Sequence, residues 1–143
     1  MEFNQTFTLE TLPKLVEQLA ACKKHCAIFT FSGSLGAGKT TIIRELLRAW
    51  GVKESITSPT FNYVNSYRNA QGETFYHFDL YRIGSVDQFI QAGFDEFIYA
   101  PNSWALIEWP DSIRPLLKHA VCDVSIEYGL HSSQRIVSYE IIK

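Results

Sequence analysis

Apolar residues along this chain recur at two spacings, one typical of helices and one typical of strands. Helical spacing over residues 12–24 and again over residues 41–50 predicts two helices. Thr11 has the residue type of an N-cap for the first helix, and Gly51 that of a C-cap for the second. Residues 3–9 alternate loosely and predict a short edge strand.

Alternating runs predict most of the remaining strands. The runs 61–68 and 74–80 flank a turn signal at residues 69–72, so we expect them to pair as an antiparallel hairpin. The runs 121–128 and 134–142 should form a second hairpin or two neighbouring strands.

The segment between these two pairs of strands mixes both patterns. Residues 86–98 predict two short helices broken at Gly93, and residues 112–118 predict another short helix. Residues 102–108 form an apolar run that ends in Glu108, which predicts a strand with an acid at its end.

Composition is typical of a globular protein with one domain. The chain has 143 residues, of which 46% are hydrophobic and 20% charged, so we expect a single domain over residues 1–143. The formal net charge of -2 provides no basic surface of the kind that binds nucleic acid directly. The N-terminus has no signal-peptide pattern, and no apolar run is long enough to span a bilayer. The expected compartment is therefore the cytoplasm.

The strongest chemical signal is a glycine-rich segment, residues 33–40, that fits the P-loop pattern G-x-x-x-x-G-K-[ST]. The apolar run 27–31 before it and the helical pattern after it supply the strand–loop–helix context of a P-loop. Backbone N–H groups of such a loop cradle phosphate, Lys39 can reach the β- and γ-phosphates, and the Thr40 hydroxyl can ligate Mg²⁺. The candidate nucleotide-binding residues here are Ser34, Leu35, Gly36, Ala37, Gly38, Lys39, Thr40 and Thr41.

Two further segments place acids at strand ends. Behind a P-loop, an apolar strand that ends in Glu108 has the form of a Walker B segment, which holds Mg²⁺ directly or through water. Residues 77–82 bring His77, Asp79 and Arg82 to the end of another strand. Nucleotide chemistry in open α/β sheets takes place at such strand ends. Asp79 is therefore a candidate site residue, with an ordinary solvated ion pair as the alternative.

Two features stay open. The hydroxyl-rich residues 55–60 form either a plain surface loop or a switch-like loop that brings Ser58 or Thr60 near the γ-phosphate or Mg²⁺. Arg135, near the turn between the last two strands, either touches the nucleotide or is a solvent-exposed cation.

Four segments stand in order along the chain: the P-loop at 33–40, S-P-T-F at 58–61, H-x-D-x-Y-R at 77–82 and I-E-W-P at 107–110. Together they resemble the bacterial TsaE family (also called YjeE), the small P-loop ATPases of tRNA threonylcarbamoyladenosine synthesis. The resemblance covers about residues 8–135, and the last three segments are far more specific than the P-loop alone.

The resemblance implies an α/β fold, a single P-loop NTPase-like domain with a mostly parallel central sheet flanked by helices and with antiparallel hairpin strands. It implies ATP and Mg²⁺ as ligands. It also implies two protein partners, TsaB and TsaD, which with this family complete the N6-threonylcarbamoyl modification of adenosine 37 in tRNAs that read ANN codons. Any role of tRNA would be indirect, and no membrane is implied.

The resemblance and the chemistry of P-loops together assign candidate roles. The expected catalytic residues are Lys39, Asp79 and Glu108, and the expected Mg²⁺ ligands are Thr40, Glu108 and Asp79. Beyond the P-loop, the expected nucleotide contacts are Trp109, Arg135 and Thr11, with Thr8 as the alternative to Thr11. The sequence leaves open whether Asp79 or Glu108 lies nearer the metal.

The sequence also bears on turnover and on rival functions. No arginine finger or water-positioning glutamine stands out, so we expect ATPase activity that is weak alone and stimulated by partners. The rivals are a small-molecule or nucleoside kinase, a GTPase switch, and a module in which ATP is only structural. The sequence has neither the arginine-rich lid usual in such kinases nor the Asn-Lys-x-Asp element that reads guanine.

Overall fold

The structure, a computed structural model, describes residues 2–8, 10–59, 62–118, 120–131 and 133–143. The strands are β1 (Glu2–Phe7), β2 (Ile28–Gly33), β3 (Val64–Arg68), β4 (Thr74–Asp79), β5 (Ser103–Glu108), β6 (Val121–Tyr128) and β7 (Arg135–Ile142). The α-helices are α1 (Leu12–Ala21), α2 (Lys39–Ala49) and α3 (Val86–Gln91), and the 3₁₀ helices are η1 (Cys22–Lys24), η2 (Phe94–Phe97) and η3 (Pro110–Leu116).

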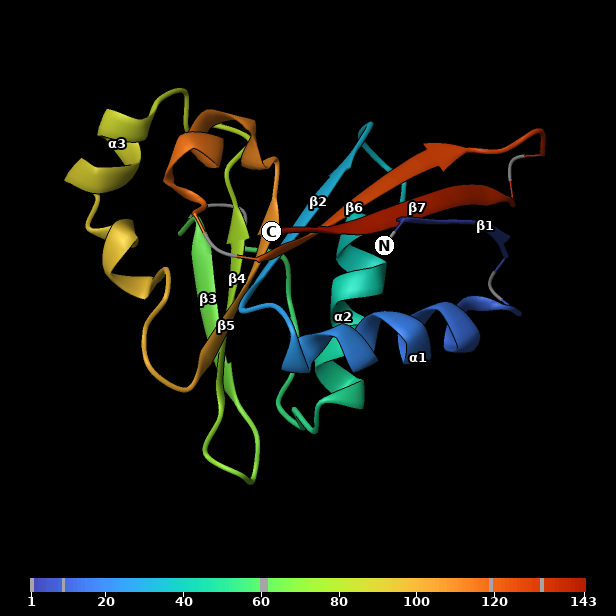
Figure 1. Ribbon diagram of the computed structural model, residues 1–143, viewed down its shortest axis with the longest axis horizontal. Helices are drawn as coiled ribbons and strands as arrows, with labels where there is room; N and C mark the ends of the chain where they lie inside the picture. Colours follow the sequence, from blue (N-terminus) through green and yellow to red (C-terminus); the bar gives the residue numbers. More distant parts are fainter. Residues whose placement is uncertain (1, 9, 60–61, 119, 132) are drawn as a thin grey trace.

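A seven-stranded mixed sheet runs through the described part of the chain in the order β1-β7-β6-β2-β5-β4-β3 (Figure 1). The central strands β6, β2, β5 and β4 pair in parallel, whereas the pairs β1–β7, β7–β6 and β4–β3 are antiparallel. Parallel neighbours need a crossover connection, and the helical segments α2, α3, η2 and η3 lie within these connections. The predicted α/β fold is confirmed, with the antiparallel pairs toward the two edges of the sheet.

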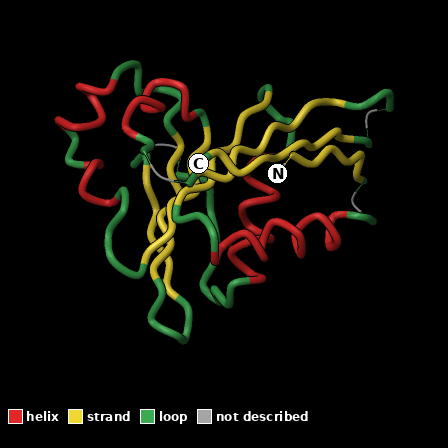
Figure 2. The backbone as a smooth tube through the Cα atoms, viewed as in Figure 1, coloured by secondary structure: helices red, strands yellow, loops and turns green. Residues whose placement is uncertain are grey.

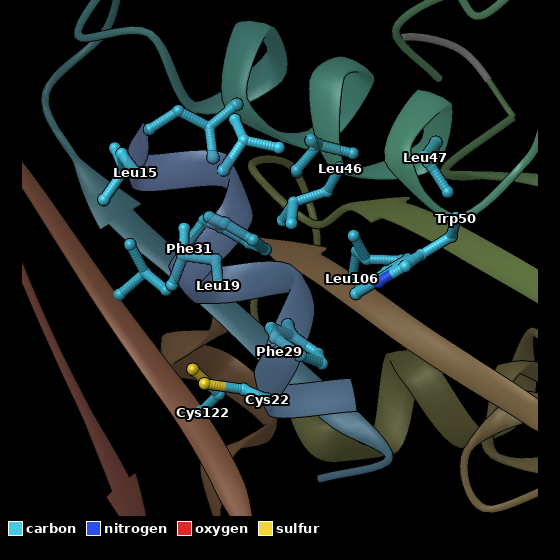
Figure 3. Close-up of a cluster of buried hydrophobic side chains, with 14 of the residues drawn as sticks. Leu15, Leu19, Cys22, Phe29, Phe31, Leu46, Leu47, Trp50, Leu106 and Cys122 are labelled. Carbon is cyan, nitrogen blue, oxygen red and sulfur yellow. The ribbon is translucent and has the colours of Figure 1, made fainter. Parts of the chain in front are cut away.

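Each face of the central strands buries its own cluster of apolar side chains. On one face, Leu19 of α1 and residues of α2 pack against Phe29 of β2 (Figure 3). On the other face, Phe89 of α3 belongs to a second cluster. Strand β5 contributes side chains to both clusters, because Leu106 belongs to the first cluster and Ile107 to the second. Burial on both faces is what a parallel strand between helical layers requires.

The predicted hairpins are confirmed. β3 and β4 pair antiparallel with Val64 opposite Phe78, and the loop between them projects from the sheet (Figure 2). β6 and β7 also pair antiparallel. The strand predicted over residues 3–9 is β1, which ends at Phe7 and lies at the sheet edge; Leu9 falls outside the described residues.

The two long predicted helices are confirmed with shifted ends. α1 and η1 together occupy residues 12–24. α2 begins at Lys39 rather than Thr41, so the last P-loop residues belong to its first turn. Gly51 follows α2 with φ 92°, the left-handed conformation expected of a glycine that ends a helix. No helix in the described ranges is long and apolar enough to cross a membrane.

Two local predictions are corrected. The helix predicted over residues 112–118 is a 3₁₀ segment that starts at Pro110, and Pro115 inside it lacks the N–H that a longer α-helix would need. Thr11 occupies the N-cap position of α1 without capping it. Its hydroxyl instead accepts a hydrogen bond of 2.8 Å from the Thr8 N–H and donates one of 3.3 Å to the Thr8 carbonyl. The Thr11 side chain therefore hydrogen-bonds to the segment before the helix instead of to the helix itself.

Candidate nucleotide-binding site

The P-loop connects the carboxyl end of β2 to the amino end of α2, which confirms its predicted strand–loop–helix context. Gly33 lies so close to β6 that a Cβ there would be 2.4 Å from the carbonyl oxygen of Ile126. Gly38 is the N-cap of α2 with φ 111°, a conformation that favours glycine. The loop therefore folds back over a helix N-terminus, where backbone N–H groups attract anions.

Lys39 lies inside the P-loop. Its Nζ donates hydrogen bonds of 2.6 Å to the Gly33 carbonyl and 3.0 Å to the Ser34 carbonyl. It also lies 4.1 Å from the ring centroid of Trp109. Burial lowers the pKa of Lys39, and the nearby Glu108 carboxylate partly opposes that shift. The loop thus holds its cation close to the position where phosphate oxygens would lie in a P-loop.

Glu108, the last residue of β5, contacts two polar side chains next to the P-loop. The Thr40 hydroxyl lies 3.0 Å from Glu108 Oε2 and 3.1 Å from Oε1. His77 Nε2 lies 2.6 Å from the same oxygen, Oε2 of Glu108. Glu108 and His77 are both buried. Sequence reasoning placed His77 at a strand end but gave it no role; its spacing of two residues from Asp79, which puts both side chains on one face of β4, was the available signal.

Asp79, the last residue of β4, stands in register with Glu108 on β5. Its Oδ1 accepts a hydrogen bond of 3.1 Å from the N–H of Tyr81. Burial raises the pKa of the Asp79 carboxyl, and the neighbouring Glu108 carboxylate adds to that shift. Of these two acids, Glu108 is the one in direct contact with the Thr40 hydroxyl.

Trp109 follows Glu108 in an unusual backbone conformation. Its φ and ψ are 58° and 59°, the left-handed region that bulky residues rarely adopt. Its ring makes an edge contact with Tyr81, with centroids 4.9 Å apart. Strained residues of this kind cluster at functional sites, and this one lies next to both Glu108 and Lys39.

A cavity of about 550 Å³ opens on the other side of the P-loop. Its lining comes from the segment between β1 and α1, from the P-loop and α2, and from the start of β7. The lining residues are Phe7, Thr8, Glu10, Leu12, Gly36, Ala37, Gly38, Thr41, Ile42, Ser133 and Arg135. Pockets that bind small molecules have volumes in this range and a mostly apolar lining with few polar groups.

Arg135 forms one wall of the cavity. Its Nε donates a hydrogen bond of 3.0 Å to the carbonyl of Ala37 in the P-loop. Its guanidinium lies 4.3 Å from the ring centroid of Tyr128. The structure therefore places Arg135 against the P-loop and in the lining of the cavity. Thr8 lines the same cavity, whereas Thr11 is not part of the lining and contacts Thr8.

The residues around the P-loop thus form two groups, which combine predicted site residues with others that the structure adds. We call Thr40, His77, Asp79 and Glu108 the acidic side, and Phe7, Thr8, Leu12, Ser133 and Arg135 the cavity side. Within the loop, Ser34 and Leu35 are exposed and do not line the cavity. Ser58 of the hydroxyl-rich loop is exposed, and Thr60 and Phe61 fall outside the described residues.

Comparisons with known proteins identify relatives over nearly the whole chain. A family model described as "Threonylcarbamoyl adenosine biosynthesis protein TsaE" matches residues 6–137. The tRNA threonylcarbamoyladenosine biosynthesis protein TsaE of Rickettsia conorii is 38% identical over 130 residues, which is 90% of this chain and 72% of the relative. The protein of the same name from Haemophilus influenzae is 35% identical over 116 residues, 80% of this chain and 72% of the relative.

The fold also has a solved counterpart. The crystal structure of YdiB from a Bacillus species matches with a TM-score of 0.76, over 100% of this chain and 87% of that chain, at 21% identity. At this identity the likeness bears on the fold alone. The match of the family model, by contrast, includes the P-loop, the acidic side and all of the cavity side. The chain belongs to the TsaE family of threonylcarbamoyl adenosine biosynthesis proteins.

Proposed function

We propose that this protein binds ATP and Mg²⁺ and hydrolyses ATP in the N6-threonylcarbamoylation of adenosine 37 of tRNAs that read ANN codons. The observation that carries the proposal is the convergence of Lys39, Thr40 and Glu108 beneath one P-loop. Family membership supports the pathway, and the P-loop chemistry supports the nucleotide.

The chain's own groups fit ATP. Backbone N–H groups at the start of α2, together with the Lys39 ammonium, suit the phosphates. The cavity side has room for the rest of a nucleotide, with apolar walls from Phe7, Leu12 and Ile42 and a cation from Arg135. The Trp109 ring lies outside the cavity lining and contacts the Lys39 ammonium.

The acidic side fits Mg²⁺. A hydroxyl and two carboxylates supply only oxygen donors, which are the ligands that Mg²⁺ prefers. Within the described ranges no group of three or more His, Cys, Asp or Glu side chains could hold a metal by itself. Mg²⁺ is usually held by one or two carboxylates plus water and phosphate oxygens. Thr40 and Glu108 would hold the ion, and Asp79 would act through water.

The roles of the residues follow from phosphoryl-transfer chemistry. Bound Mg²⁺ supplies positive charge that neutralises the phosphate oxygens. Lys39 adds a second positive charge and positions the γ-phosphate, while Glu108 orients the Thr40 hydroxyl. Asp79, a carboxylate at the neighbouring strand end, orients the attacking water. No arginine finger stands out in the sequence, so we expect turnover by the chain alone to be slow.

The partners TsaB and TsaD are part of the proposal. A partner would complete the site or move the loop of residues 58–61, which is the usual logic of switch loops. The contact with tRNA is then made through the complex, consistent with the net charge of -2. The expected compartment is the cytoplasm, where tRNA is modified.

The test is ATP hydrolysis by the purified chain, alone and with TsaB and TsaD. We expect the partners to stimulate turnover and Glu108→Ala to lower it by about 100-fold or more. Glu127→Ala removes an exposed acid on β6 and serves as the matched control, with turnover like that of the wild type.

Other outcomes point to the rivals. Equal turnover with and without partners would contradict the missing catalytic group. ATP binding without any turnover would make ATP a structural ligand. Unchanged function in Glu108→Ala, with ATP still bound, would lead to the same conclusion. Rapid phosphorylation of a small acceptor would favour a kinase, and stronger competition by GTP than by ATP would favour a GTPase.

A further inference from the structure

His77 is a buried polar side chain that the proposed function does not use. It lies on β4 between Phe75 and Phe78, and its side chain has no exposed surface. Its Nε2 lies 2.6 Å from Glu108 Oε2, and its Nδ1 has no hydrogen-bond partner within the described ranges. Burial of an imidazole is costly unless it is hydrogen-bonded, so the contact with Glu108 is what makes the position tolerable.

The chemistry of the two groups sets the direction of this hydrogen bond. A carboxylate only accepts, so Nε2 carries the proton and donates to Oε2. A distance of 2.6 Å is short even for a hydrogen bond to a charged acceptor, which makes this one of the strong contacts of the site.

The sheet geometry explains how His77 reaches Glu108. In the parallel pair β4–β5, His77 is in register with Leu106, and Asp79 is in register with Glu108. His77 and Glu108 are therefore diagonal neighbours on one face of the sheet, within reach of a long side chain. The carboxylate of Glu108 therefore contacts His77 on the neighbouring strand as well as Thr40 in the first turn of α2.

A glutamate side chain can rotate about three bonds, and Thr40 alone restrains it from only one direction. The hydroxyl lies almost equally far from both oxygens, at 3.0 and 3.1 Å, so it does not select one orientation of the carboxylate. The contact with His77 involves Oε2 alone and removes that freedom. Oε1 then has the Thr40 hydroxyl as its contact.

We propose that His77 is a positioning residue that holds the Glu108 carboxylate in the orientation needed to act with Thr40 on Mg²⁺. This inference rests on the proposed Mg²⁺ and ATP function of the same site. His77 itself touches neither metal nor nucleotide. Its effect is transmitted through Glu108, as expected for the groups that orient a metal ligand from behind.

The test compares two replacements of His77. His77→Gln keeps an N–H donor at about the reach of Nε2, and His77→Leu fills similar space without a donor. We measure Mn²⁺ binding in the presence of a non-hydrolysable ATP analogue, analogue binding in EDTA, and ATP turnover. We expect His77→Leu to weaken Mn²⁺ binding and to lower kcat, each by about tenfold or more, with analogue binding in EDTA unchanged. His77→Gln should stay within about threefold of the wild type.

A second arm tests whether His77 acts through Glu108. In a Glu108→Gln background, His77→Leu should cause no further loss of Mn²⁺ binding, because the carboxylate that it positions is already gone. Full additivity of the two changes would overturn the proposal. Equal losses in His77→Leu and His77→Gln, or weaker analogue binding in EDTA, would assign His77 to packing alone. Wild-type behaviour of His77→Leu would overturn any role.

The readouts also separate this inference from the function on which it rests. A wild-type chain that binds Mn²⁺ with the analogue but never hydrolyses ATP would refute the ATPase, while Mn²⁺ binding would still decide the role of His77. A wild-type chain that binds no Mn²⁺ would refute both. If His77→Leu does not fold, His77→Asn replaces it, since its shorter amide cannot reach Glu108 Oε2, and the same comparison with His77→Gln decides.

Discussion

The two sides of the P-loop are built in different ways. The acidic side lies at the ends of two central parallel strands, where Asp79 and Glu108 stand in register. The cavity side depends on an antiparallel pair at the edge of the sheet, where Phe7 of β1 stands in register with Arg135 of β7. On the first side His77 and Glu108 are buried, side-chain hydrogen bonds join Glu108 to His77 and Thr40, and Asp79 lies half-buried beside them. The second side is an open hollow.

This difference separates chemistry from recognition. A buried carboxylate held by hydrogen bonds, as Glu108 is, keeps its geometry without help from a ligand, which suits it to act on developing charge. An open cavity with apolar walls gains binding energy from a ligand but does not determine where the reacting atoms lie. We therefore expect changes on the acidic side to lower kcat and changes on the cavity side to raise KM.

The largest effect is expected at Lys39, which lies between the two sides. Lys39→Ala removes the cation that contacts two P-loop carbonyls and the Trp109 ring. ATP turnover should fall by about 100-fold or more. Lys14→Ala, at an exposed position of α1, is the control and should behave as wild type. Normal turnover in Lys39→Ala would show that the P-loop is not the phosphate site.

The next largest effect is expected at Asp79. Asp79→Asn keeps the size of the side chain and removes its charge, so kcat should fall by about tenfold or more while KM for ATP changes little. Steady-state kinetics at saturating Mg²⁺ measure both. A raised KM with an unchanged kcat would move Asp79 from the chemistry to the binding of substrate, and would break the division between the two sides.

Asp79→Asn, which should lower kcat, should at the same time raise the stability of the folded protein. Burial raises the pKa of Asp79 in the folded state, so the carboxylate destabilises the fold as pH rises from the ordinary Asp pKa through the raised one. We expect Asp79→Asn to increase Tm at pH 7 in EDTA, with the gain shrinking toward pH 4. Thermal unfolding across this pH range measures it, and a lower Tm of Asp79→Asn at pH 7 would contradict the destabilising carboxylate.

A smaller effect is expected on the cavity side. Arg135→Gln removes the cation that lies against the P-loop carbonyl of Ala37. Loss of one charged hydrogen-bond donor should raise KM for ATP by about tenfold and leave kcat within about twofold. A fall in kcat with unchanged KM would instead make Arg135 part of the chemistry.

The smallest effect distinguishes Thr8 from Thr11. Thr8 lines the cavity, and Thr11 only braces the Thr8 backbone. Thr8→Val should raise KM for ATP by about threefold, whereas Thr11→Val should leave KM unchanged and cost about 1 kcal/mol of stability. The reverse pattern would restore Thr11 as the nucleotide contact.

Much of the acidic side could be predicted from the sequence. The P-loop and the acid at the end of β5 are local patterns, because their chemistry requires particular residues within one turn or at one strand end. The contact of Glu108 with His77 was not predictable, since it joins residues 31 positions apart through the register of β4 and β5. Only the pairing of strands determines which side chain on β4 faces Glu108.

The cavity side was far less predictable. Arg135 was left between two interpretations, because its distance from the P-loop depends on β7 returning antiparallel between β6 and β1. Thr11 was the expected nucleotide contact, with Thr8 as the alternative, yet the Thr11 hydroxyl bonds to the Thr8 backbone. The hydroxyl of a threonine can serve a helix or a loop with similar energy, and tertiary packing decides which.

By itself, the sequence determined the P-loop, the helix that follows it and the acids at the ends of two strands. Each of these depends on backbone conformation and hydrogen bonding within a few residues. The tertiary structure alone decided the order of the strands, the His77–Glu108–Thr40 contacts and the cavity between the two ends of the chain. These depend on how both faces of the sheet bury their apolar side chains, a condition that no local pattern contains.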